Sequence, residues 1–259
     1  MSVEVAEEHG HYHDPHLQHQ FEDMDQQNES YVVGMWTFLV TEIMFFGALF
    51  LAYTIYRGEN PGVFLEAHHH LNVLMGAINT MVLLTSSLTM AMAVYHAQMK
   101  NRRKQMMFLG ITILFSFCFL IIKGLEWREK FRDNHVPGPN FKYELEVKQT
   151  KGAPIMTTSP PAVMHLVGDT KVDFPKDTVA PDYASKAELF FALYFAMTGL
   201  HAFHVIIGIL VMGTLFFMLM FKHPSVDYYM PVEMAGLYWH FVDIVWIFLF
   251  PLYYLIPGS

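Results

Sequence analysis

The sequence predicts an all-α integral membrane protein with five transmembrane helices. Hydrophobic residues make up 53% of the 259 positions and charged residues only 15%, well below the ~25% charged residues of soluble domains. The apolar residues also occur in blocks of roughly 20 or more, which are expected only where lipid replaces water. Both observations favour a bundle of spanning helices over a soluble core.

The apolar blocks place the helices in order along the chain. Each block meets the ~17–25 residues that a bilayer requires. The third block is the shortest, whereas the fourth is long enough to tilt or to project from the membrane. We expect the fourth helix to start at a capping box formed by Ser185 and Glu188 and to end before Pro224. The predicted helices cover about 32–56, 71–97, 106–126, 187–221 and 234–256.

Basic residues between the second and third helices predict the orientation. The sequence K-N-R-R-K at 100–104 is four-fifths basic, and such clusters stay on the cytoplasmic side. Five helices then place the N-terminus in the cytoplasm and the C-terminus in the periplasm. The long polar segment at about 127–186 falls outside, because long loops translocate largely regardless of charge. Its length indicates an ordered cap or an insertion that docks a partner.

Residues outside the helices limit the class of function. Residues 1–30 are acidic and histidine-rich, and we interpret them as a mobile tail. The formal net charge of -8 argues against nucleic-acid binding, which needs clustered Lys and Arg. Cys118 is the only cysteine, so no disulfide or cysteine metal site can form within the chain. The histidines of the tail could bind zinc or gather protons, but a solvated role is favoured for His11, His13, His16 and His19.

Glu42 is the most informative single residue, because it lies in the middle of an apolar helix. A charged acid at that depth costs about 2.5–3.5 kcal/mol on insertion scales. Phe38 and Phe46 lie one turn away on either side, so the rest of its helix face is aromatic and dry. We expect Glu42 to face protein or a lipid-filled interior and to be protonated much of the time.

Other polar residues are predicted to lie inside the bundle and to hold its helices together. On the fourth helix two histidines three residues apart share one face, and Gly199 and Gly208 permit close contact with a neighbouring helix. On the last helix a His and an Asp with the same spacing could form an internal hydrogen bond. The predicted structural polar network comprises His201, His204, His240, Asp243, Asn79 and Glu126.

Three interpretations compete for these polar groups. A metal or haem site is disfavoured, because no helix carries a Glu-x-x-His motif and the histidines lack the pairing of a bis-histidine haem. A proton or substrate pathway is the default for ionisable groups in a membrane. Mutual hydrogen bonding between helices accounts best for most of the set. Glu42 is the exception, since only Thr41 or the backbone could pair with it within its own helix.

Several long motifs in these helices follow the order and spacing of a known family. The segment GMWTFLVTEIMFFGALFLAY resembles G-x-W-x-F-[IL]-x-[ST]-E-[VI]-[LM]-F-F, and TGLHAFHVIIG resembles T-G-[FL]-H-G-x-H-V-x-x-G. The segments NTMVLLTSSLTMA, KGLEWREKF and YWHFVDIVWIFLFPLYYL are similar in the same order. The family that they resemble is subunit III of the haem-copper terminal oxidases, in its five-helix bacterial form.

The resemblance implies a non-catalytic subunit of a proton-pumping cytochrome c oxidase in a bacterial inner membrane. Subunit III of this family binds no haem or copper, which lie in partner subunits. It packs against catalytic subunit I in a complex with subunit II, binds phospholipid in a cleft, and supports oxygen access, proton uptake and stability in turnover. Membership of a larger respiratory supercomplex stays open. Glu42 matches the family's carbodiimide-reactive carboxylate.

The chain also departs from the family pattern. The N-terminal helix pair of seven-helix members is absent, so we expect another chain to supply it. Ala202 replaces a glycine between the histidines, and Met218 stands where some members place a lipid-binding arginine. Three alternatives remain: subunit III of a quinol oxidase, an accessory protein of a nitric oxide reductase, and a small proton-coupled transporter. The last is disfavoured, because we see neither internal repeats nor broken helices.

Overall fold

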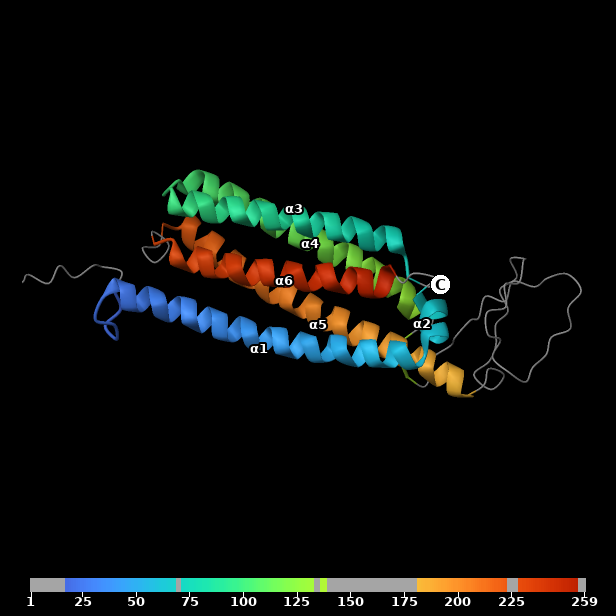
Figure 1. Ribbon diagram of the computed structural model, residues 1–259. Coiled ribbons are helices and arrows are strands. Elements are labelled where there is room, and N and C mark those ends of the chain that lie inside the picture. Colours follow the sequence, from blue (N-terminus) through green and yellow to red (C-terminus); the bar gives the residue numbers. More distant parts are fainter. Residues whose placement is uncertain (1–16, 69–70, 133–135, 139–180, 223–227, 256–259) are drawn as a thin grey trace, which may run out of the picture.

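The computed structural model describes residues 17–68, 71–132, 136–138, 181–222 and 228–255. These residues form six α-helices and no β-strand (Figure 1). The helices are α1 (Met24–Glu59), α2 (Pro61–His68), α3 (Val73–Gln98), α4 (Arg102–Arg132), α5 (Pro181–Met220) and α6 (Met230–Tyr254). All except α2 are long and apolar enough to cross a membrane. The predicted all-α class with five spanning helices is therefore confirmed.

The five long helices lie side by side along one axis (Figure 1). The pair α3 and α4 forms the most extensive contact, and α6 packs against α1, α3 and α5. The short helix α2 closes one end of the bundle. Its Phe64 is fully buried and packs edge-on against Tyr53 of α1 and Phe190 of α5.

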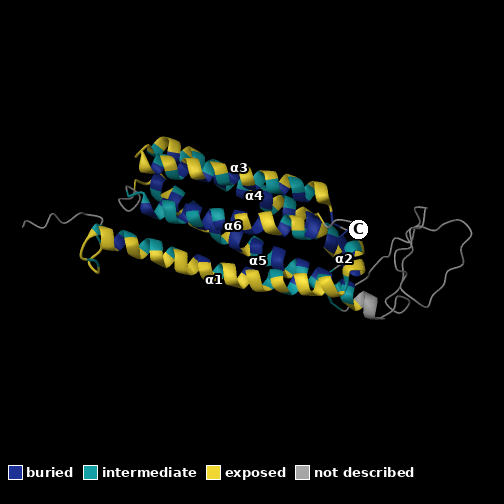
Figure 2. Cartoon of the chain, viewed as in Figure 1, coloured by how far each residue is buried: buried dark blue, intermediate teal, exposed yellow. Residues whose placement is uncertain are grey.

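Exposure differs sharply between the outer and inner helices. Figure 2 shows α1 exposed along most of its length, whereas α6 is largely buried. The side chains of Met44 and Leu51 on α1 are 70% and 62% exposed. Such apolar surface is expected on a helix that faces lipid rather than water. The molecule is therefore a multi-pass membrane protein with α6 near the centre of its bundle.

The first helix begins earlier than predicted, within the segment that we interpreted as a tail. Asp23 is its N-cap, since the Asp23 carboxylate accepts a hydrogen bond of 2.7 Å from the Gln26 backbone N–H. Such a cap satisfies a backbone donor that the helix start otherwise leaves free. Residues 24–30 are therefore helical, while residues 1–16 lie outside the described residues.

The third spanning helix, α4, was predicted to be the shortest, and this was wrong. It has 31 residues, more than the 26 of α3 and the 25 of α6. Its first turn contains Arg102 and Arg103, whose long side chains can reach the membrane surface from an apolar helix. Its last turns contain Arg128, Glu129, Lys130 and Arg132, which lie beyond the predicted end at 126. Polar residues therefore extend α4 at both ends.

The predicted capping box at the start of the fourth spanning helix was also wrong. Ser185 lies inside α5, which already begins at Pro181, a residue type favoured in the first turn of helices. With 40 residues, α5 has a length of about 60 Å at 1.5 Å per residue. Its N-terminal end extends beyond the ends of α1 and α6 (Figure 1). The predicted insertion thus shortens to 133–180, and nearly all of it lies outside the described residues.

Glycines allow the closest approaches between helices. A Cβ atom on Gly208 of α5 would lie 2.7 Å from the ring of Trp239 on α6, so this position requires glycine. Gly236 plays the same part between α6 and Val94 of α3, where the corresponding distance is 2.8 Å. At Gly199 a Cβ would make only an ordinary contact of 3.5 Å with Trp127. The prediction of close contact is therefore confirmed at Gly208.

Candidate functional site

Glu42, about halfway along α1, meets His204 on α5. Its Oε2 lies 3.1 Å from Nε2 of His204, and the two side chains are 19% and 11% exposed. Phe46 packs edge-on against the imidazole, with 5.3 Å between the ring centroids. Glu42 thus has a partner that sequence spacing within α1 could not reveal, because the partner comes from a helix far along the chain.

The hydrogen bond made by the second ring nitrogen of His204 determines how many hydrogens the Glu42–His204 pair carries. Nδ1 lies 2.8 Å from the backbone oxygen of Leu200. A carbonyl oxygen only accepts hydrogen bonds, so Nδ1 carries a hydrogen. The contact between Nε2 and Glu42 then needs one further proton, on the Glu42 carboxyl group or on Nε2 itself. Both forms carry no net charge, which avoids the cost of ~2.5–3.5 kcal/mol for a lone charge at membrane depth.

A second polar cluster joins α4, α5 and α6. Nζ of Lys123 donates to Glu126 Oε2 at 3.1 Å, to the Tyr194 hydroxyl at 2.9 Å and to the Tyr254 hydroxyl at 2.8 Å. The hydroxyl of Tyr194 donates to Glu126 Oε1 at 2.7 Å, and the hydroxyl of Tyr254 donates to the same oxygen. All four side chains are buried.

This cluster is complete in its hydrogen bonds and balanced in its charge. An ammonium group has three donors, and each N–H of Lys123 has an acceptor. Both oxygens of Glu126 accept, and each tyrosine hydroxyl both accepts and donates. A closed network of this kind is stable in a low-dielectric interior, where a single unpaired member would be costly.

Of the four members, only Glu126 was among the residues predicted from the sequence. A usable signal was present for Lys123, which lies three residues before Glu126 in FLIIKGLEW. That spacing puts both side chains on one helix face, and a lysine within an apolar segment needs a partner. The two tyrosines carried no such signal, because tyrosine is common at the ends of spanning helices.

The remaining predicted residues do not form one network. Nδ1 of His240 lies 2.7 Å from the Ser87 hydroxyl on α3. The predicted bond between His240 and Asp243 does not form, since the histidine ring is turned toward α3 and neither Asp243 oxygen has a hydrogen-bond partner within the described residues. Side-chain polar atoms of Asn79 and His201 also lack partners there.

The surroundings of His201 differ from those of His204 on the same helix. His201 is 1% exposed. The centroid of its ring lies 5.1 Å from that of the Trp246 ring and 5.6 Å from that of the Phe119 ring. This pocket is aromatic, so His201 acts as a packing side chain. Within the described residues, no three His, Cys, Asp or Glu side chains lie close enough to hold a metal ion.

The fold and these two clusters define a class of protein. It is a helical multi-pass membrane protein in which buried polar side chains form hydrogen bonds between helices, and each group of side chains carries no net charge. Comparison with known proteins makes the class specific. The family model for cytochrome c oxidase subunit III matches residues 176–257, which include α5 and α6. The matched region contains His204, Tyr194 and Tyr254 from the two clusters.

Full-length relatives extend the similarity to the other helices. Cytochrome c oxidase subunit 3 of Bacillus sp. (strain PS3) is 28% identical over 226 residues, which cover 86% of this chain and 84% of that protein. The corresponding protein of Bacillus subtilis (strain 168) is 26% identical and covers 90% of both chains. A heme-copper oxidase subunit I+III of Aeropyrum pernix is 27% identical over 86% of this chain and 22% of its own length. These matches show that the chain is similar over most of its length to subunit III of the haem-copper oxidases, the family that its motifs resemble.

Proposed function

We propose that this chain is the accessory subunit III of an aerobic respiratory cytochrome c oxidase, which reduces O2 to water and pumps protons. The observation that carries the proposal is the similarity to two bacterial cytochrome c oxidase subunits over most of both chains. In the proposed complex, haem and copper lie in subunits I and II. The complex is embedded in a bacterial inner membrane, with the N-terminus of this chain in the cytoplasm and its C-terminus in the periplasm.

The proposed contact with subunit I is supported by a relative in which the two subunits are one protein. The Aeropyrum pernix protein is named heme-copper oxidase subunit I+III, so it combines subunit I and subunit III in a single polypeptide. Fusion of this kind requires that the two parts can lie next to each other in one membrane. In the present chain we place subunit I and bound phospholipid against the outer faces of the bundle.

The accessory role is supported by what the two polar clusters can do chemically. The cluster of Lys123, Glu126, Tyr194 and Tyr254 joins α4 to α5 and α6 through four hydrogen bonds, so it stabilises the bundle. The Glu42–His204 pair ties α1 to α5 and holds one shared proton. We assign to this pair the support of proton uptake by the complex, because its hydrogen bond joins an acid and an imidazole at membrane depth.

Glu42→Gln tests the accessory role within the assembled oxidase. The glutamine amide can donate to Nε2 of His204 as the protonated acid does, so the contact and its neutrality are retained. We expect normal assembly and near wild-type initial rates of oxygen consumption. We also expect carbodiimide labelling of this position to be lost, since the amide replaces the reactive carboxyl group.

A matched control separates this effect from general changes on α1. Glu59 is an exposed carboxylate on the same helix, and Glu59→Gln should leave labelling at Glu42 unchanged. Glu42→Leu, by contrast, leaves Nε2 of His204 without a partner and should cost about 1–3 kcal/mol of stability. If Glu42→Gln abolished oxygen reduction in an intact complex, the accessory role would be wrong.

The alternatives make different predictions about neighbouring subunits. In a quinol oxidase the same helices occur, and subunit II lacks the dinuclear copper motif of a cytochrome c oxidase, so the sequence of that partner decides the electron donor. A nitric oxide reductase would consume nitric oxide in place of oxygen. A transporter would be isolated without haem-bearing partners. The names of the bacterial relatives favour the cytochrome c oxidase.

A further inference from the structure

A polar pair of side chains lies on the outside of the bundle where α3 and α6 meet. Nδ1 of His240 on α6 lies 2.7 Å from the Ser87 hydroxyl on α3, and both residues are partly buried. The other ring nitrogen of His240, Nε2, has no hydrogen-bond partner within the described residues. It is open at the surface, whereas both ring nitrogens of His201 are enclosed by protein. One polar atom of the pair therefore faces out of the bundle.

The surface around this pair is apolar. On α6, Ile244 and Ile247 follow His240 by one and two turns, and both are exposed. On α3, Leu84 lies one turn before Ser87 and is also exposed. We call these five residues the α3–α6 face. The helices α1 and α3 lie on opposite sides of α6 (Figure 1), so within the described residues this face is left uncovered.

The polar pair lies near the middle of the membrane. His240 is ten residues after Met230, where α6 begins, and Ser87 is eleven residues before Gln98, where α3 ends. At 1.5 Å per residue these separations are about 15 Å and 17 Å. They equal about half of the ~30 Å hydrocarbon core. Lipid headgroups and bulk water are therefore about one leaflet away from Nε2 of His240.

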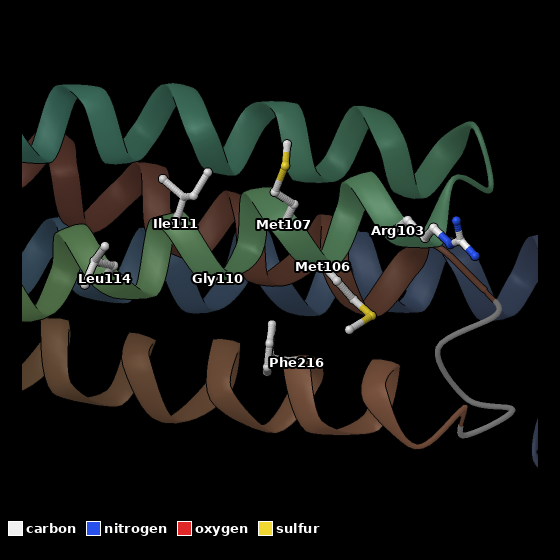
Figure 3. A pocket seen from close by; sticks show the side chains of 7 residues that line it. All are labelled: Arg103, Met106, Met107, Gly110, Ile111, Leu114 and Phe216. Atoms are coloured by element: carbon white, nitrogen blue, oxygen red, sulfur yellow. The ribbon is translucent and has the colours of Figure 1, made fainter.

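A shallow hollow of about 470 Å³ between α4 and α5 differs from the α3–α6 face in this respect (Figure 3). Its lining residues, among them Gly110 and Phe216, are apolar except for Arg103 in the first turn of α4. Acyl chains can cover such a surface without leaving a hydrogen-bonding group unpaired. They cannot do so at the α3–α6 face, because they offer no partner to Nε2 of His240, and an unpaired polar group in hydrocarbon is costly.

The small side chains beside the polar pair suit a second helix. Ser87 and Ala91 lie one turn apart on α3, and Ala91 is exposed. Small residues at this spacing let the backbones of two membrane helices approach closely. Leu84 and Ile244 offer apolar contact next to them. A helix packed here would gain close contact and could also satisfy the imidazole, whereas an acyl chain could only pack.

We propose that a transmembrane helix of another polypeptide packs over the α3–α6 face and forms a hydrogen bond with Nε2 of His240. A neutral imidazole carries a hydrogen on only one ring nitrogen, so Nε2 donates or accepts according to how Nδ1 binds Ser87. A hydroxyl or carboxamide side chain on the partner helix serves in either case, and such groups join helices in membranes. The inference rests on the proposed function only for the identity of the partner, which in an oxidase is a neighbouring subunit.

Photo-cross-linking in the native membrane tests the α3–α6 face. The photoreactive residue p-benzoylphenylalanine replaces Ile244, and mass spectrometry identifies the cross-linked product. We expect one predominant cross-link, to a polypeptide other than this chain. Adding His240→Leu should lower its yield several-fold, because leucine fills the space without forming the hydrogen bond. His240→Gln should retain more of the cross-link, since an amide can still donate and accept.

Thr85→Val is the matched control on α3. Thr85 is exposed at nearly the same depth as Ser87, but its hydroxyl donates to the Met81 backbone oxygen of its own helix at 2.8 Å. The yield of the cross-link from position 244 should therefore be unchanged. Thermal unfolding of the His240→Leu chain checks its fold. We expect an unfolding temperature close to that of the wild type, because the variant loses only the contact with Ser87 inside this chain.

Three results would overturn the proposal. Adducts to lipid alone would mean that acyl chains cover the α3–α6 face. A cross-link to a second copy of this chain would mean that the face joins identical chains. Equal yields with and without His240→Leu would mean that the helix packs there without the hydrogen bond. By contrast, a cross-link that depends on His240 but leads to a complex without haem would support this inference and contradict the oxidase assignment, so the two proposals fail separately.

Discussion

Lys123→Met should destabilise the protein by about 3–5 kcal/mol, the usual cost of removing one partner from a buried ion pair. The variant leaves Glu126 buried, with two tyrosine hydroxyls still donating to it but without the balancing ammonium group. The same change removes three donors from a network in which every donor is used. Thermal unfolding of the protein in detergent, followed by circular dichroism, measures the loss.

A double variant shows whether charge balance is the cause. Lys123→Met combined with Glu126→Gln removes both charges and keeps an amide oxygen to accept from Tyr194 and Tyr254. We expect the double variant to recover much of the lost stability, because an uncharged replacement for a buried pair is often neutral. Lys104→Met replaces an exposed lysine of the same helix and should have little effect. Additive losses in the double variant would contradict this account.

Gly208→Val should be the next most damaging change. The added Cβ would lie 2.7 Å from the ring of Trp239, which is fully buried and donates a hydrogen bond to Ser86. Overpacking of a core typically costs about 1–3 kcal/mol. The contact between α5 and α6 must widen to relieve the overlap, so we expect a lower unfolding temperature.

The same substitution at Gly213 is the control for Gly208→Val. Both glycines lie on α5, but a Cβ at Gly213 has no atom within 4 Å. Helix propensity changes equally in the two variants, so the difference in unfolding temperature reports the overlap with Trp239. Equal unfolding temperatures would show that α5 and α6 do not approach as closely as described.

The spanning helices could be predicted from the sequence because their cause is local. Lipid requires a minimum apolar length, and five blocks met it. The ends of the helices were harder, because they depend on caps and side-chain pairs. Asp23 starts α1 within a polar segment, and α4 continues past its apolar block through the largely charged residues 127–132. The capping-box pattern at Ser185 misled for a related reason, since the same residues also fit inside a helix.

The polar pairings could be predicted only in part, because they depend on which helices are neighbours. His201 and His204 look alike in the sequence, yet one is packed among aromatic rings and the other meets Glu42. Spacing within a helix shows which residues share a face, but not what lies opposite that face. This also explains why His240 pairs with Ser87 of α3 rather than with Asp243 on its own helix.

Purification of the tagged chain from its native membrane tests the assignment most directly. The account predicts that haem-bearing polypeptides with oxygen-reducing activity copurify with it, and that the chain shows no haem or copper absorption once they are dissociated. Isolation of the chain by itself from intact membranes, or stoichiometric haem or copper on the separated polypeptide, would contradict it.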